Sequence, residues 1–127
     1  MGLTVEFFKK YGKCIYMTKT CRDPYFAKFP PIICKDDTFI SAQAGENYHC
    51  YPKENLDTFE YETVELNRNE VTDAERLLSP FICNYDKYVY DNVPVEVVDE
   101  IIKRHGGLDY EKVEAFITKA NNWEVGG

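Results

Sequence analysis

The sequence lacks several features that mark common protein classes. It has no apolar run of about eighteen residues, so no segment is predicted to span a membrane. The stretch MGLTVEFFKKYGK has no apolar signal-peptide core, which predicts a cytoplasmic protein. Gly-rich phosphate loops and the H-E-x-x-H metal motif are also missing. We therefore expect no cofactor, no membrane partner and no enzymatic activity.

Histidine is scarce and the cysteines do not form a recognisable metal pattern. The chain has two His residues and five Cys residues, with no C-x-x-C pair. An odd number of irregularly spaced cysteines is typical of reduced thiols in a cytoplasmic protein. The candidate zinc ligands are Cys14, Cys21, Cys34, Cys50 and His49. They lack the usual spacing of zinc ligands, so we predict no metal.

Thiol catalysis remains a lesser alternative. A Cys-His nucleophile pair requires the two side chains to face each other. His49 and Cys50 are adjacent, and neighbouring side chains of a strand point to opposite faces. Cys83 with His49, or Cys50 with His105, could meet across the fold and would make a small cysteine-dependent enzyme.

What the sequence does contain is a large aromatic and apolar content with an uneven charge. Hydrophobic residues make up 44% and aromatic residues 15% of 127 residues, which predicts one domain, 1–127, with a modest core. Residues 1–35 carry seven Lys or Arg against two acidic residues, a net charge of +5. Residues 36–127 carry eight basic and twenty acidic residues, a net charge of −12. Such asymmetry bears on binding partners.

Three interpretations of this charge division compete. The basic segment 1–35 could fold against the acidic body 36–127 and neutralise it. The same segment, whose Lys and Arg alternate with aromatic rings over residues 7–29, could bind single-stranded nucleic acid. The acidic body could instead occupy a basic groove that another protein uses for nucleic acid.

Hydrophobic periodicity predicts an α+β fold: a short antiparallel sheet of about four to five strands, an N-terminal helix and a C-terminal helix hairpin. Thr4 is predicted to cap the first helix, Pro94 to open the second and Asp109 to cap the third. The predicted helices are 4–11, 94–105 and 109–122, with one or two helical turns at 71–78, and the predicted strands are 13–18, 31–35, 38–44, 59–66 and 81–90.

Two blocks of sequence carry a resemblance. The first contains Ser41, Gln43, Ala44, Tyr48, His49, Cys50, Pro52 and Lys53, and the second contains Val93, Pro94, Val95, Glu96, Val97, Val98, His105, Gly106 and Gly107. Together they resemble a pattern of small phage and prophage accessory proteins, although Lys53 stands where that pattern has Arg. The resemblance implies a protein made in a bacterial host cytoplasm, of a kind that includes anti-CRISPR and anti-restriction inhibitors.

These observations predict a non-enzymatic interaction protein whose acidic surface binds a host protein with a basic nucleic-acid-binding surface, such as a CRISPR effector or another nuclease. The expected acidic contacts are Glu60, Glu62, Glu65, Glu70, Asp73 and Glu75, with a second group of Asp91, Glu96, Asp99 and Glu100. Tyr48, Tyr51, Tyr61, Tyr88 and Tyr90 are the expected aromatic anchors, since aromatic residues concentrate binding energy at interfaces. Direct nucleic-acid binding through residues 7–29 is the alternative.

Overall fold

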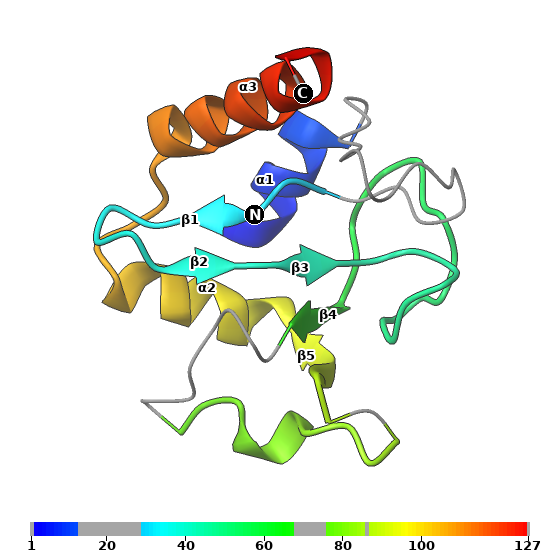
Figure 1. Ribbon diagram of the computed structural model, residues 1–127. Coiled ribbons are helices and arrows are strands. Elements are labelled where there is room, and N and C mark those ends of the chain that lie inside the picture. Colours follow the sequence, from blue (N-terminus) through cyan, green and yellow to red (C-terminus); the bar gives the residue numbers. More distant parts are fainter. Residues whose placement is uncertain (1, 13–28, 68–75, 86, 127) are drawn as a thin grey trace.

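The computed structural model describes residues 2–12, 29–67, 76–85 and 87–126, and side chains as far as Lys119 (Figure 1). Four of the predictions fall wholly or mostly outside this part of the chain. They are the strand 13–18, the helical turns at 71–78, residues 13–28 of the basic aromatic stretch 7–29, and the acidic contacts Glu70, Asp73 and Glu75.

Three α-helices lie close to where periodicity places them. They are α1 (Leu3–Tyr11), α2 (Val95–Arg104) and α3 (Tyr110–Gly126). Pro94 precedes α2, whose buried side chains follow helical spacing, and His105 ends it. Asp109 caps α3 as predicted, because its carboxylate accepts a hydrogen bond from the amide of Lys112 at 3.2 Å.

The predicted cap of α1 is wrong. The N-cap residue is Gly2, which has no side chain to bond the first amides, and Thr4 lies inside the helix. The carboxylate of Asp99 on α2 takes over the capping role, because it accepts hydrogen bonds from the Thr4 amide at 2.8 Å and the Thr4 hydroxyl at 2.6 Å. This contact joins the two helices at residues far apart in the sequence.

Five short strands form two antiparallel sheets, which confirms the α+β class. The first sheet pairs β1 (Ile32–Ile33) with β2 (Phe39–Ile40). The second has the order β3 (Ala42–Gln43), β4 (Thr63–Asn67), β5 (Val89–Pro94). The register of β4 against β5 shifts between Val64 and Leu66, which marks a bulge or a similar irregularity in the pairing.

Two predicted strands are misplaced along the chain. The strand predicted from residue 59 begins only at Thr63, because Phe59 has a positive φ of 58° and the backbone turns before it extends. The strand predicted over 81–90 does not begin at Phe81, because this residue ends a 3-10 turn, η2 (Ser79–Phe81), which Pro80 at its start favours. Ile82 forms only an isolated bridge with Tyr90. Extended pairing begins at Val89 and continues to Pro94.

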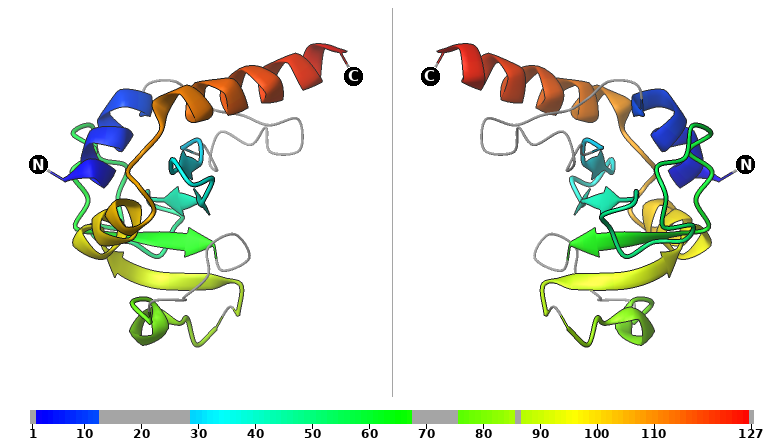
Figure 2. Two further views of the ribbon diagram at one scale, coloured as in Figure 1. Left: turned by 90° about the vertical axis from the view of Figure 1, so that its left-hand side faces the viewer. Right: turned by 90° about the vertical axis from the view of Figure 1, so that its right-hand side faces the viewer.

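Helix α1 lies between α2 and α3 and contributes most of the aromatic core (Figure 1). Phe7 and Phe8 are fully buried, and Phe8 stacks on Phe29 with ring centroids 4.1 Å apart. Tyr11 donates a hydrogen bond to Glu114 on α3 at 2.9 Å. Figure 2 shows α3 along one end of the molecule and residues 76–85 at the opposite end. Among the described residues, no helix has the length and apolar character needed to cross a bilayer.

Candidate functional site

Five exposed carboxylates gather on the loop before β4 and the first turn of α2. We call this surface the acidic edge; it consists of Glu54, Asp57, Glu60, Glu62 and Glu96. Residues 54–62 contain four acidic and no basic residues. Of these five carboxylates, only Glu60 has an ion-pair partner among the described residues: Lys9 Nζ lies 3.0 Å from Glu60 Oε1.

The backbone brings the members of the acidic edge together. The amide of Val95 donates to the carbonyl of Glu62 at 3.1 Å, so Glu62 lies beside the start of α2 and Glu96. The hydroxyl of the buried Tyr61 donates to the carbonyl of Glu54 at 2.7 Å. This bond holds the loop at Glu54 against Tyr61, which lies between Glu60 and Glu62 in the chain. Glu62 and Glu96, which the sequence assigns to two separate acidic groups, therefore lie beside each other. Glu54 and Asp57 were not among the predicted site residues, although both lie in the polar stretch 48–57.

The other acidic candidates have contacts within the fold. Asp99 binds Thr4, as described above, and Glu100 pairs with Arg104 at 3.1 Å on the same helix. Glu65 and Asp91 face His49 from neighbouring strands. These four residues are thus occupied by intramolecular partners.

The aromatic candidates divide by exposure. Tyr51 and Tyr88 are exposed, with 59% and 53% of their surface accessible. Tyr61 and Tyr90 are buried in the core, and Tyr48 is half-buried against it. Only Tyr51 and Tyr88 therefore present most of a ring to a partner. Tyr85 was not among the predicted anchors, yet it is 95% exposed.

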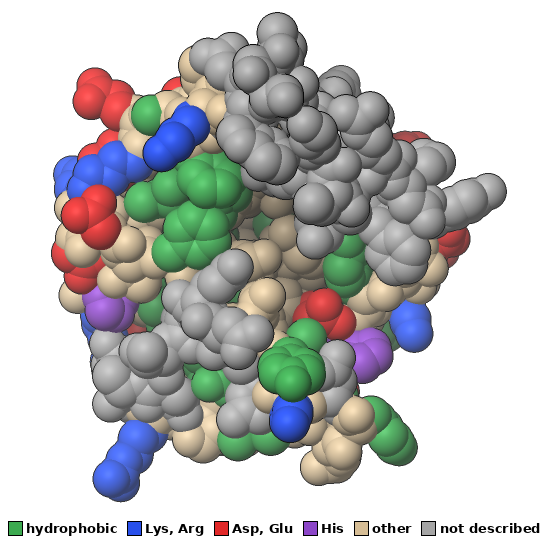
Figure 3. Space-filling view, in the orientation of Figure 1, with side chains coloured by type: hydrophobic (Ala, Val, Ile, Leu, Met, Phe, Trp, Pro, Cys, Tyr) green, Lys and Arg blue, Asp and Glu red, His purple; other side chains and the backbone are tan. Residues whose placement is uncertain are grey.

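The segment that carries Tyr85 and Tyr88 also exposes Ile82. Figure 3 shows hydrophobic side chains at the lower edge of one face, where Figure 1 places the segment 76–89. Scattered exposed apolar residues are normal on protein surfaces. Three of them within seven residues make this segment the most apolar exposed stretch among the described residues.

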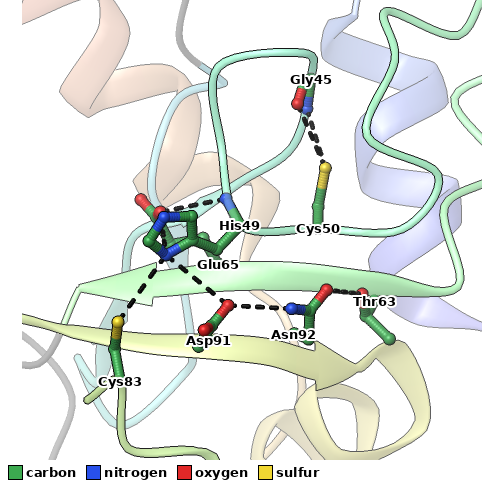
Figure 4. Close-up of polar contacts among 8 residues, drawn as sticks. All are labelled: Gly45, His49, Cys50, Thr63, Glu65, Cys83, Asp91 and Asn92. Carbon is green, nitrogen blue, oxygen red and sulfur yellow. Dashed lines mark hydrogen bonds and ion pairs between the residues drawn. The ribbon is translucent and has the colours of Figure 1, made fainter. Parts of the chain in front are cut away.

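A second group of side chains surrounds one nitrogen of His49 (Figure 4). Its Nδ1 lies 3.8 Å from Cys83 Sγ, 3.6 Å from Asp91 Oδ1 and 3.7 Å from Glu65 Oε1. The polar atoms of His49, Cys83 and Asp91 all lie within 4.8 Å of one another. Cys83 is buried, whereas the side chain of His49 is 38% exposed. The sequence raised the pairing of Cys83 with His49 only as an open alternative and gave no signal for Asp91.

Backbone and side-chain hydrogen bonds hold this group in place. The His49 amide donates to Glu65 Oε1 at 3.2 Å, and the Asn92 amide donates to the His49 carbonyl at 3.1 Å. The Asn92 side chain donates to Asp91 Oδ1 at 2.9 Å and accepts from the Thr63 hydroxyl at 3.0 Å. The amide of Cys83 donates a hydrogen bond to the carbonyl of Val89 on β5 at 3.4 Å.

The remaining described thiols do not join His49. Cys50 is buried. Its Sγ accepts a hydrogen bond from the Gly45 amide and donates one to the Gly45 carbonyl, and it points away from the imidazole (Figure 4). Cys34 is buried opposite Leu108. Burial, with a smaller effect of the Asp36 charge, raises the pKa of Cys34 to about 11, so this thiol is protonated at neutral pH.

The described part of the basic segment contributes to the core more than to the surface. Phe7, Phe8 and Tyr11 are buried, so their rings cannot stack on bases. Lys9 pairs with Glu60 at 3.0 Å, which is one exposed contact between the described part of the basic segment and the acidic body.

Comparisons of the chain with the profiles of known protein families, with curated proteins and with solved structures find no match.

Proposed function

We propose that the chain is a non-enzymatic interaction protein that docks through its acidic edge on a basic, nucleic-acid-binding surface of another protein. The partner class that suits this chemistry best is a nuclease of a host defence system, for which a phage or prophage protein would be the inhibitor. The observation that carries the proposal is the gathering of five exposed carboxylates with one described cation partner.

The charge of the acidic edge fits this partner class. A groove that binds nucleic acid is lined with Lys and Arg, and carboxylates on a rigid surface can occupy the positions of phosphates. The backbone bond between Glu62 and Val95 holds the backbone of Glu62 beside the start of α2, so the chain positions of Glu62 and Glu96 are set before binding. Strong charge complementarity would speed association with the partner and compete with nucleic acid for the same groove.

A charge-matched pair of variants tests the proposal. Glu62→Gln/Glu96→Gln removes two charges from the acidic edge, whereas Asp37→Asn/Glu111→Gln removes two exposed charges from the β1–β2 turn and from α3. Binding to a panel of purified RNA-guided nucleases and restriction enzymes is measured by interferometry at low and moderate salt.

For a nuclease that binds the wild-type chain, the first variant should weaken binding by about 10-fold or more, and the control should not. Affinity should also fall steeply with added salt. Binding that is insensitive to salt, or equally weakened by both double variants, contradicts docking through the acidic edge. Failure of all these nucleases to bind contradicts the proposed partner class.

A further inference from the structure

Three ligand-type side chains from three separate segments converge on one small volume. Cys83 follows η2, His49 lies in the loop after β3, and Asp91 lies on β5. A buried thiol, a partly exposed imidazole and a carboxylate are the ligand types that zinc prefers.

The distances from His49 Nδ1 to the two carboxylates suit a shared ion better than hydrogen bonds. A ring nitrogen carries at most one hydrogen and can donate to one acceptor, yet His49 Nδ1 faces a sulfur and two carboxylate oxygens. The two oxygens lie at 3.6 and 3.7 Å, beyond hydrogen-bond range. The ligand atoms of a tetrahedral zinc ion lie roughly 3.3 to 3.8 Å from one another, given the usual zinc–ligand distances.

Neighbouring groups orient these side chains as second-layer partners orient zinc ligands. Asn92 donates to the Asp91 carboxylate, and Thr63 in turn donates to Asn92. Glu65 binds the His49 amide and fixes the loop that presents the ring. Such outer hydrogen bonds hold ligands in the geometry that the metal requires.

We propose that Cys83 Sγ, His49 Nδ1 and Asp91 bind a zinc ion, with water in the fourth coordination position. The ion would fasten the segment 76–88 to β5 and to the loop after β3. It would thereby fix the exposed side chains Ile82, Tyr85 and Tyr88 relative to the sheet. This inference is independent of docking through the acidic edge, since no residue is common to the two.

Metal titration of the reduced protein tests the site. Zinc affinity is measured by competition with a chromogenic chelator, and Co²⁺ is used as a spectroscopic probe of thiolate ligation. The variants are Cys83→Ser and His49→Gln, and the matched control is Cys50→Ser, which alters a buried thiol that points to Gly45 instead. Far-ultraviolet circular dichroism checks that each variant is folded.

The wild-type chain and Cys50→Ser should bind one zinc ion and give a sulfur-to-cobalt charge-transfer band. Cys83→Ser should lose that band, and both ligand variants should bind zinc more than about 10-fold more weakly. Asn92→Gly should weaken zinc binding by about 10-fold, because it removes the bond to Asp91 while glycine accepts the φ of 50° at this position.

A readout in the unmodified chain covers the case in which a ligand variant does not fold. Zinc should protect Cys83 from alkylation in the wild-type protein, with the modified peptide identified by mass spectrometry. Undiminished zinc binding by folded Cys83→Ser and His49→Gln, or no zinc protection of Cys83, would overturn the site. In that case His49 only lies beside the two carboxylates.

Discussion

The carboxylate of Asp99 on α2 accepts two hydrogen bonds from Thr4, a fully buried residue of α1 ninety-five positions away in the sequence. One bond comes from the amide and the other from the hydroxyl. Since Gly2 offers no capping side chain, Asp99 is the group that satisfies the start of α1. A residue that looked like a partner contact in the sequence therefore has a structural role.

Asp99→Ala should destabilise the fold. It leaves the buried Thr4 hydroxyl and an α1 amide without their acceptor, which should lower the free energy of unfolding by about 2 kcal/mol. Asp99→Asn keeps one acceptor oxygen and should lose less. Urea unfolding followed by circular dichroism measures both. Glu100→Ala, which removes only an exposed pair with Arg104, is the control and should cost about 0.5 kcal/mol or less. Equal losses for Asp99→Ala and Glu100→Ala would show that the cap is unimportant.

Tyr61→Phe should destabilise the loop that carries the acidic edge. The Tyr61 hydroxyl donates to the Glu54 carbonyl and accepts from the Leu56 amide at 2.9 Å, and burial raises the pKa of Tyr61. Removing the oxygen should cost about 1 kcal/mol in urea unfolding. Tyr51→Phe changes an exposed hydroxyl and should leave the stability unchanged. A similar loss in both variants would count against the loop bonds as the cause.

The sequence predicted the parts of the fold that depend on local patterns. Val98, Ile101 and Ile102 follow helical spacing after Pro94, and this pattern located α2 closely. The strand over 81–90 was misplaced because its aromatic residues are common in strands, and this composition does not show where pairing begins. Burial of Tyr90 against β4, which no local pattern reveals, decides that pairing begins at Val89.

The sites depend on long-range contacts and were less predictable. Glu62 and Glu96 were assigned to different groups, and only the backbone bond from Val95 to Glu62 shows that they share a surface. Asp91 meets His49 and Cys83 because β5 pairs beside β4 and the segment after η2 folds back onto β5. The spacing of residues along the sequence could not show that His49, Cys83 and Asp91 meet. It gave no reason to prefer them to the set first considered for zinc, which is Cys14, Cys21, Cys34, Cys50 and His49.

Acid should weaken the contact between the β1–β2 turn and the end of α2. Hydrogen bonds from Thr38, with a smaller contribution from His105, lower the pKa of Asp36 from 3.8 to about 2. Because the pKa is lower in the folded state, the Asp36 carboxylate stabilises the fold above pH 4, and this contribution is lost as the pH falls from about 4 to 2.

Asp36→Asn should therefore be less stable than the wild type near pH 6, and the difference should shrink toward pH 2. Urea unfolding at several pH values measures it. Asp57→Asn, an exposed residue of the acidic edge, is the control and should show no such convergence. A constant difference between Asp36→Asn and the wild type across this range would contradict the ionised Asp36 as its source.

Cys34 should be unreactive until the protein unfolds. Its side chain is fully buried and burial raises its pKa to about 11, so only about 0.1% is thiolate at pH 8. Alkylation at pH 8, followed by mass spectrometry of the Cys34 peptide, should be at least about 100-fold slower in the native state than in urea. The Cys50 peptide offers an internal comparison, because burial also raises the pKa of that thiol. Rapid native labelling of Cys34 would mean that the contact between β1 and the start of α3 opens readily, since Cys34 pairs there with Leu108.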